Sequence, residues 1–151
     1  MSEHQTWLPH VVVAAIVEHD GKFLLVEEET TDGLRLNQPA GHWERNETLQ
    51  QAVMREAMEE TGHHVEPVAL LGAYTTTHTT RDITYVRFAY VCNVTGFNPD
   101  AVLDKGIVRA VWLTVEEIAA SAIPHRSPLV LRCVQDYLRG QRFPLDVVAQ
   151  L

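Results

Sequence analysis

The sequence predicts a mixed α/β fold in which a central sheet lies between helical layers. One observation is the order of the elements along the chain, which runs strands, helix, strands, short helix, helix. Another is segment 10–18, which is apolar on both alternating faces and should therefore be covered on both sides. We expect one domain over residues 1–151, because a chain of 151 residues can enclose a substantial core.

The strands are predicted from apolar runs and alternating patterns bounded by turn residues. They cover residues 10–18, 22–28, 66–77, 84–95 and 107–113, with a short extended segment at 34–39. Asp20 and Gly21 form a strong hairpin signal between the first two strands. Loops are expected at 30–33 and 96–105.

The first helix follows the glycine-containing loop 41–45. Asn46 is the expected N-cap, because its side chain can accept a hydrogen bond from the first turn. The helix is predicted to run to about Thr61 and to end at Gly62, which suits the left-handed position after a helix.

Two helices and a packed tail are expected after the last strand. Thr114 begins a sequence, Thr-Val-Glu-Glu, that matches a capping box. A final helix is predicted at about 127–139. The tail 140–151 is too apolar for a free end, so we expect it to pack on the body of the protein.

Composition argues against several functional classes. The formal charge of -8 disfavours nonspecific binding to a nucleic acid polymer or an anionic membrane, which needs Lys/Arg clusters. No apolar run approaches the roughly 18 residues of a membrane span, and the first residues lack a signal-sequence pattern. We therefore expect a cytoplasmic protein in which Cys92 and Cys133 are reduced, buried thiols. Its oligomeric state, monomer or dimer, is left open.

Three carboxylates, those of Glu56, Glu59 and Glu60, lie on the apolar side of the first helix. A helix advances about 100° per residue. That rotation aligns the acids with the apolar residues Leu49, Ala52, Val53 and Ala57. Charges normally lie opposite such a stripe, and like charges at this spacing repel each other. A cation should offset the repulsion, and Mg²⁺ is the natural candidate because it takes oxygen ligands and bridges to phosphates.

Residues 41–63 resemble the signature of the Nudix hydrolases, G-x5-E-x7-R-E-U-x-E-E-x-G-U, where U is a bulky aliphatic residue. Each charged and glycine position is present at the right spacing. The two aliphatic positions depart from the pattern, because Ala57 and His63 occupy them. The resemblance implies the Nudix α/β/α sandwich with a mixed central sheet. It also implies a Mg²⁺-dependent hydrolase in which Mn²⁺ could substitute.

Three further segments are similar to the phosphatase NudJ-like branch of that family, namely 37–42, 126–130 and 140–145. The branch implies a phosphorylated small-molecule substrate, either a nucleoside di- or triphosphate or the pyrophosphate of the thiamine pyrimidine precursor. Water would attack phosphorus. One alternative is a nucleotide-sensing Nudix module, which usually lacks carboxylates that this chain retains. Another is an enzyme like isopentenyl diphosphate isomerase, whose catalytic cysteine neither Cys92 nor Cys133 matches in position.

The resemblance assigns roles to the signature residues. The implied metal ligands are the Gly41 carbonyl, Glu56, Glu59 and Glu60. Glycine at position 41 would let the backbone approach an ion closely. Glu47 and Arg55 are expected to form a structural pair, in which the planar guanidinium of Arg55 orients a carboxylate. The resemblance also implies that the charged signature residues are catalytic, namely Glu47, Arg55, Glu56, Glu59 and Glu60.

The general base and the substrate contacts are predicted partly outside the signature. The base is either a signature carboxylate, with Glu56 the first choice, or Asp104 in the later loop. Arg35, Gln38 and Arg87 are candidate contacts to the phosphates or the organic group of the substrate. They lie in or beside sheet elements that are expected near the signature.

Overall fold

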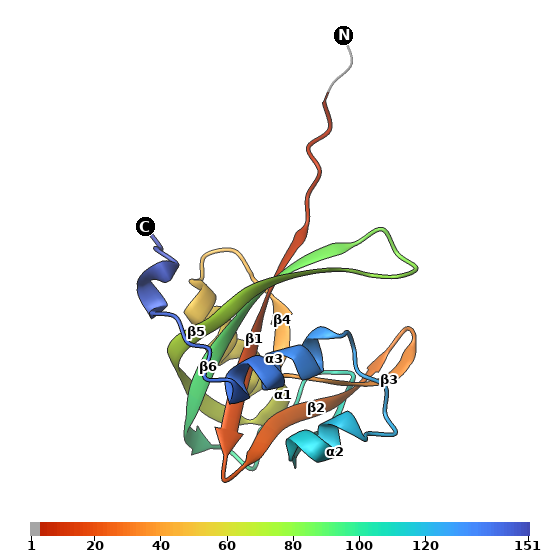
Figure 1. Ribbon diagram of the computed structural model, residues 1–151, viewed down its shortest axis with the longest axis vertical. Coiled ribbons are helices and arrows are strands. Elements are labelled where there is room, and N and C mark those ends of the chain that lie inside the picture. The colour runs from red at the N-terminus through yellow and green to blue at the C-terminus, as the bar shows by residue number, and fades with distance from the viewer. Residues whose placement is uncertain (1–3) are drawn as a thin grey trace.

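The computed structural model describes residues 4–151, and this part of the chain forms a seven-stranded sheet (Figure 1). The strands are β1 (His10–His19), β2 (Lys22–Thr30), β3 (Gly33–Asn37), β4 (Ala40–His42), β5 (His63–Thr77), β6 (Thr84–Phe97) and β7 (Ile107–Leu113). The main path is β3-β2-β1-β6-β5, with β4 paired to β1 and β7 paired to β2. Strand β1 runs parallel to β6 and antiparallel to β2 and β4, so the sheet is mixed as predicted.

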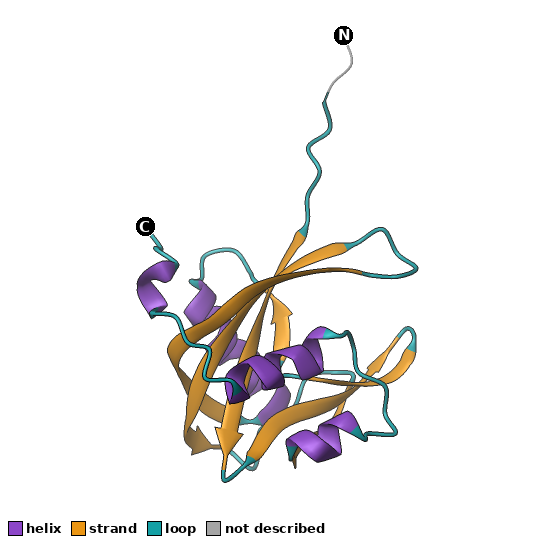
Figure 2. Cartoon of the chain, viewed as in Figure 1, coloured by secondary structure: helices purple, strands orange, loops and turns teal. Residues whose placement is uncertain are grey.

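Helices lie on both faces of the sheet (Figure 2). They are α1 (Leu49–Thr61), α2 (Val115–Ala119) and α3 (Leu129–Leu138), followed by a 3-10 turn, η1 (Leu145–Val147). Helix α1 packs on one face, and α2 and α3 pack on the other. This arrangement confirms the expected α/β/α sandwich.

Strand β1 explains why the sheet needs two covering layers. Val13, Ala15 and Val17 join the core cluster that contains the buried side of α1. Ala14 and Ile16, on the other face of the strand, join the cluster formed with α2 and α3. Because successive side chains point to opposite faces, a strand apolar at every position must be buried twice.

The N-terminus of α1 differs from the sequence prediction. Thr48, rather than Asn46, caps the helix, and its hydroxyl accepts a hydrogen bond from the backbone of Gln51 at 3.0 Å. The Gln51 side chain accepts one in return from the Thr48 backbone, which completes a capping box. Asn46 instead adopts a left-handed backbone with φ 67°. At the other end, Gly62 ends the helix in the left-handed conformation, as predicted.

Other boundaries move by a few residues for local reasons. Strands β5 and β6 extend to His63 and Phe97, because these two residues continue their antiparallel ladder. The capping box at Thr114 is present. Helix α3 begins at Leu129, later than expected, since the Ser127 hydroxyl accepts the Leu129 N–H just before the helix.

The C-terminal tail packs on the body, as predicted. Phe143 forms a bridge with Leu70 on β5. Leu145 and Val148 then pack against the α1-side core, and the Gln150 side chain accepts a hydrogen bond from the Leu49 backbone at 3.0 Å. The tail therefore helps to fix the start of α1, the helix that carries the acidic residues.

Cys92 and Cys133 are both buried and free, on β6 and α3 respectively. Across residues 4–151, the helices are all too short or too polar to cross a lipid bilayer.

Candidate active site

The site begins where β4 meets helix α1. Gly41 lies on β4, which pairs with β1. A Cβ atom at this position would overlap the carboxylate of Glu56. A side chain at this position would have to displace the Glu56 carboxylate, whereas glycine lets the backbone of β4 lie directly against the acidic face of α1.

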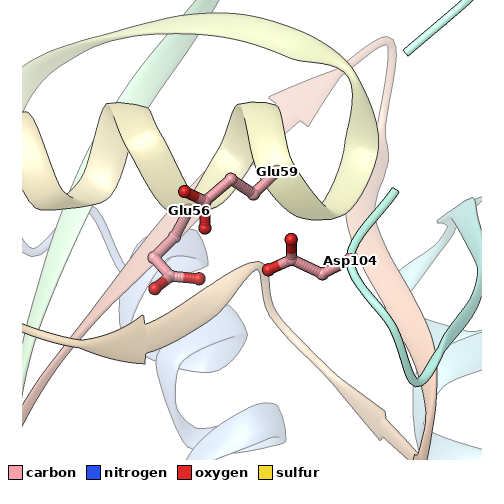
Figure 3. Close-up of side chains that lie close together, drawn as sticks. All are labelled: Glu56, Glu59 and Asp104. Carbon is pink, nitrogen blue, oxygen red and sulfur yellow. The ribbon is translucent and has the colours of Figure 1, made fainter. Parts of the chain in front are cut away.

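Three carboxylates gather beside Gly41. Glu56 and Glu59 project from α1, and Asp104 approaches from the loop before β7 (Figure 3). One oxygen from each lies within 4.8 Å of the others. The loop is held there because the Asp104 backbone N–H donates to the carbonyl of Glu59 at 2.8 Å. Burial falls across the cluster, from buried Glu56 through half-buried Glu59 to exposed Asp104, so the site opens to solvent at the loop.

Glu60 is not one of the three mutually close carboxylates, although burial and, less strongly, the charges of Glu56 and Asp104 raise its pKa. Its side chain is 7% exposed, and Oε1 accepts a hydrogen bond from the Ala40 backbone at 2.9 Å. In this position Glu60 ties α1 to the strand that carries Gly41. The sequence grouped Glu60 with Glu56 and Glu59, whereas the structure brings Asp104 to those two residues. A metal-binding role for Glu60 stays a prediction.

Arg55 connects the acidic residues, as its planar guanidinium can donate in several directions. It forms a bidentate pair with Glu47, with donor–acceptor distances of 2.9 and 2.8 Å. The same group donates to Glu56 at 2.8 Å and to Glu59 at 3.2 Å, and to the His42 carbonyl at 3.0 Å. The expected pairing of Glu47 and Arg55 is present in the structure. Arg55 therefore orients two carboxylates of the cluster while Glu47 fixes Arg55.

Burial and pairing separate the pKa values of these acids. Burial raises the pKa of Glu56 to about 7 and that of Glu60 to about 9. Burial also raises the pKa of Glu59, whereas the hydrogen bond from Arg55 lowers the pKa of Glu47. The acids on the inner side of the helix thus hold protons unusually well, and a bound cation would favour their ionised forms.

A cavity of about 340 Å³ adjoins Gly41 and His42. Arg87 on β6 lines it, and its role as a substrate contact stays a prediction. Gln38 is only 1% exposed, and its amide donates to the Val130 carbonyl at 2.7 Å. Arg35 lies outside the cavity wall and donates to the Leu34 carbonyl. Only Arg87 of the three predicted contacts is thus placed at the cavity, and Gln38 acts from behind it as a hydrogen-bond acceptor for Arg87.

Several cavity residues escaped prediction from the sequence. His42 lines the cavity, and its ring nitrogen lies 3.0 Å from that of His10, which is outside the lining. Both rings pack edge-on against Tyr85. Arg126 and Glu28 form an ion pair at 2.7 Å on the cavity wall. Tyr85 carried a usable signal, because it lies two residues before Arg87 and must share its face of the strand. Arg126 carried a weaker one, within the segment that resembles the NudJ-like branch.

Comparison with known proteins agrees with this geometry. The chain matches the NUDIX domain over residues 8–133. It is 37% identical to phosphatase NudJ of Escherichia coli K12 over 140 residues, covering 93% of this chain and 90% of that protein. A NUDIX hydrolase from Nitrosomonas europaea has a similar structure, with a TM-score of 0.92, 47% identity, and 95% and 98% of the two chains covered. The NUDIX domain of Shewanella oneidensis NrtR, complexed with ADP ribose, shares the fold at a TM-score of 0.68 and 16% identity, over 88% of this chain and 90% of that one. The chain therefore belongs to the Nudix hydrolase family and is a homologue of phosphatase NudJ.

Proposed function

We propose that this Nudix hydrolase cleaves diphosphate linkages in a Mg²⁺-dependent reaction, in which Mn²⁺ could substitute. Its proposed substrates are nucleoside di- and triphosphates or the pyrophosphate of the thiamine pyrimidine precursor. The observation that carries this proposal is the convergence of Glu56, Glu59 and Asp104 beside Gly41, where a Cβ atom would overlap the Glu56 carboxylate. The homology to phosphatase NudJ supports the choice of substrates.

The donor set fits a hard divalent cation. Carboxylate oxygens are the ligands that Mg²⁺ prefers, and the three in this cluster lie close enough to share one ion. Arg55 divides its single charge among several acids, which leaves the cluster with excess negative charge. Glu56, Glu59 and Asp104 would hold the ion, and the Gly41 carbonyl and Glu60 are proposed as further ligands. Bound Mg²⁺ would neutralise phosphate oxygens and orient a water molecule toward phosphorus.

The chain's own residues supply orientation and proton transfer. Arg55 holds the Glu56 carboxylate in one direction, because Glu47 fixes the opposite edge of the guanidinium. Glu56 is our first choice of base, because Arg55 fixes its carboxylate within the cluster where the metal-oriented water would lie. Asp104 is the alternative base, because it faces Glu56 from an exposed loop (Figure 3).

The two rival functions find less support in the molecule. A sensor has no need of a complete acidic signature, and this chain retains all four glutamates of it. An isomerase would need a reactive cysteine. Cys92 and Cys133 are both buried, and burial raises the pKa of each thiol, which disfavours the reactive thiolate.

Phosphate release tests the proposal directly. The purified protein should be incubated with a panel of nucleoside di- and triphosphates and with the thiamine pyrimidine pyrophosphate in excess Mg²⁺. We expect turnover of at least one member and its loss in EDTA. In H₂¹⁸O the label should appear in a phosphate product. Nucleotide binding without turnover would indicate a sensor, and label found only in the organic alcohol would show cleavage of a carbon–oxygen bond.

A further inference from the structure

Among the described residues 4–151, no carboxylate forms an ion pair with the buried cation Arg87. Its residue is 5% exposed. The guanidinium donates to Gln38 Oε1 at 2.9 Å and to Asn37 Oδ1 at 3.0 Å, and it lies 3.8 Å from the Cys133 sulfur. The Gln38 and Asn37 amide oxygens carry no charge. Burial raises the pKa of the Cys133 thiol and so favours its neutral form. Within residues 4–151, every carboxylate that forms an ion pair with an arginine does so with an arginine other than Arg87.

A buried charge without a counter-ion is unfavourable, because the lost hydration is not repaid by neutral acceptors alone. Proteins normally provide a partner for such a group. Arg87 lines the cavity, so a ligand there can reach the cation directly. The missing negative charge is thus most simply supplied by a molecule that enters the cavity.

Two other positive features lie on the same wall. Residues 127–129, where helix α3 begins, line the cavity. The N-terminal end of a helix carries partial positive charge and favours anions. The Leu129 N–H already donates to the Ser127 hydroxyl at 3.1 Å and Pro128 has no N–H, so this end contributes through its dipole and not through free N–H donors. Arg126 lies next to this end, and its guanidinium pairs with Glu28, which also lines the cavity. The wall therefore combines a buried guanidinium, a helix N-terminus and a second guanidinium that is already shared with an acid.

We propose that Arg87, Arg126 and residues 127–129 form a phosphate-binding subsite that requires no metal. Planar guanidinium groups match the oxygens of a phosphoryl group and bind it more strongly than neutral donors would. The phosphoryl group has two sources. It is either a phosphate of the substrate that is not held at the acidic cluster, a reading that rests on the proposed function, or inorganic phosphate itself.

Calorimetric titration of inorganic phosphate into the EDTA-treated protein tests the subsite at constant ionic strength. We expect saturable binding by the wild type and a loss of affinity of about tenfold or more in Arg87→Gln, which keeps a donor but loses the charge. Arg87→Lys keeps the charge but loses the planar fork, so its affinity should lie between those of the wild type and Arg87→Gln. Arg142→Gln is the matched control, because Arg142 is exposed and stacks on Tyr137 away from the cavity.

Circular dichroism and thermal unfolding should accompany each variant. If Arg87→Gln does not fold, Arg126→Gln takes its place, because its more exposed side chain can be changed with less effect on the core. Absence of saturable binding by the metal-free wild type would overturn the subsite. Unchanged affinity in the charge-removing variants would overturn it equally.

Steady-state kinetics of the Mg²⁺-loaded enzyme separates the two sources. If the substrate's own phosphate occupies the subsite, inorganic phosphate will inhibit competitively and Arg87→Gln will raise KM more than it lowers kcat. If free phosphate binds beside the substrate, inhibition will not be competitive and KM will change little. The calorimetric result does not depend on turnover, so failure of the subsite can be told from failure of the proposed hydrolysis.

Discussion

Replacing Glu60 by glutamine removes its charge but can keep its hydrogen bond. The Glu60 side chain is almost fully buried, and its Oε1 accepts from the Ala40 backbone at 2.9 Å. The amide oxygen of glutamine can accept the same bond. We therefore expect the fold to persist, while turnover falls at least about a hundredfold because a neutral amide is a poor ligand and counter-charge for Mg²⁺.

The same change should alter how stability depends on pH. The pKa of Glu60 rises from 4.5 to about 9 on folding, because burial disfavours the charged form. The folded state then binds the proton more tightly than the unfolded state, so the free energy of unfolding falls as pH rises between these two values. The full difference corresponds to at most about 6 kcal/mol. Glu60→Gln abolishes this penalty, so the metal-free variant should be more stable than the wild type at pH 9.

Chemical unfolding in EDTA at several pH values measures the difference, and activity in excess Mg²⁺ completes the test. Glu66→Gln is the control, because Glu66 is exposed on β5 and this variant, which keeps Glu60, should follow the wild-type stability curve. Mg²⁺ should stabilise the wild type more as pH rises, since ionised ligands bind it better. Parallel stability curves for the wild type and Glu60→Gln would refute the argument from buried charge. Near-native activity in the variant would remove Glu60 from the metal site.

Three further outcomes follow from the cluster. Activity should rise from neutral toward alkaline pH as Glu56 loses its proton, and the rise should move to lower pH as Mg²⁺ increases. A pH–rate profile insensitive to Mg²⁺ would contradict this. Asp104→Asn should remove the alkaline rise if the loop supplies the base; an intact rise would assign the base to Glu56. Gly41→Ala should displace the Glu56 carboxylate, weaken Mn²⁺ binding measured by electron paramagnetic resonance, and destabilise the protein by about 1–3 kcal/mol. Wild-type Mn²⁺ affinity in that variant would show that the contact is unimportant.

The part of the site that lies on α1 could be predicted, because helical periodicity determines which side chains share one face. Glu56 and Glu60 lie on the buried face of α1, as the sequence spacing indicates. The pairing of Arg55 with Glu47 follows from residues that are close in the chain. The N-cap of α1 was harder to predict, since Asn46 and Thr48 are both good N-cap residues. The reciprocal bond from Gln51 decided in favour of Thr48.

The remainder depends on contacts between distant segments. Asp104 joins Glu56 and Glu59 because its loop is hydrogen-bonded to the end of α1, through the carbonyls of Glu59 and Gly62. Asp104 is a candidate base in this loop on the sequence alone, but no local sequence pattern predicts the backbone contacts that place it beside Glu56 and Glu59. A residue predicted to contact substrate can likewise bond within the protein. The Gln38 amide donates to the Val130 carbonyl and accepts from Arg87.

The acidic cluster and the cavity wall come from different parts of the sequence. The acidic cluster is built mainly from one helix, so the chemistry it can perform is set within a short stretch of sequence. The cavity wall combines β1, β4, β6 and the segment that precedes α3. A change at Tyr85 or Arg126 can therefore alter what the cavity holds without disturbing Glu56 or Arg55. Enzymes with the same acidic signature can accordingly differ in substrate, and we propose that the charge balance around Arg87 contributes to that selection in this chain.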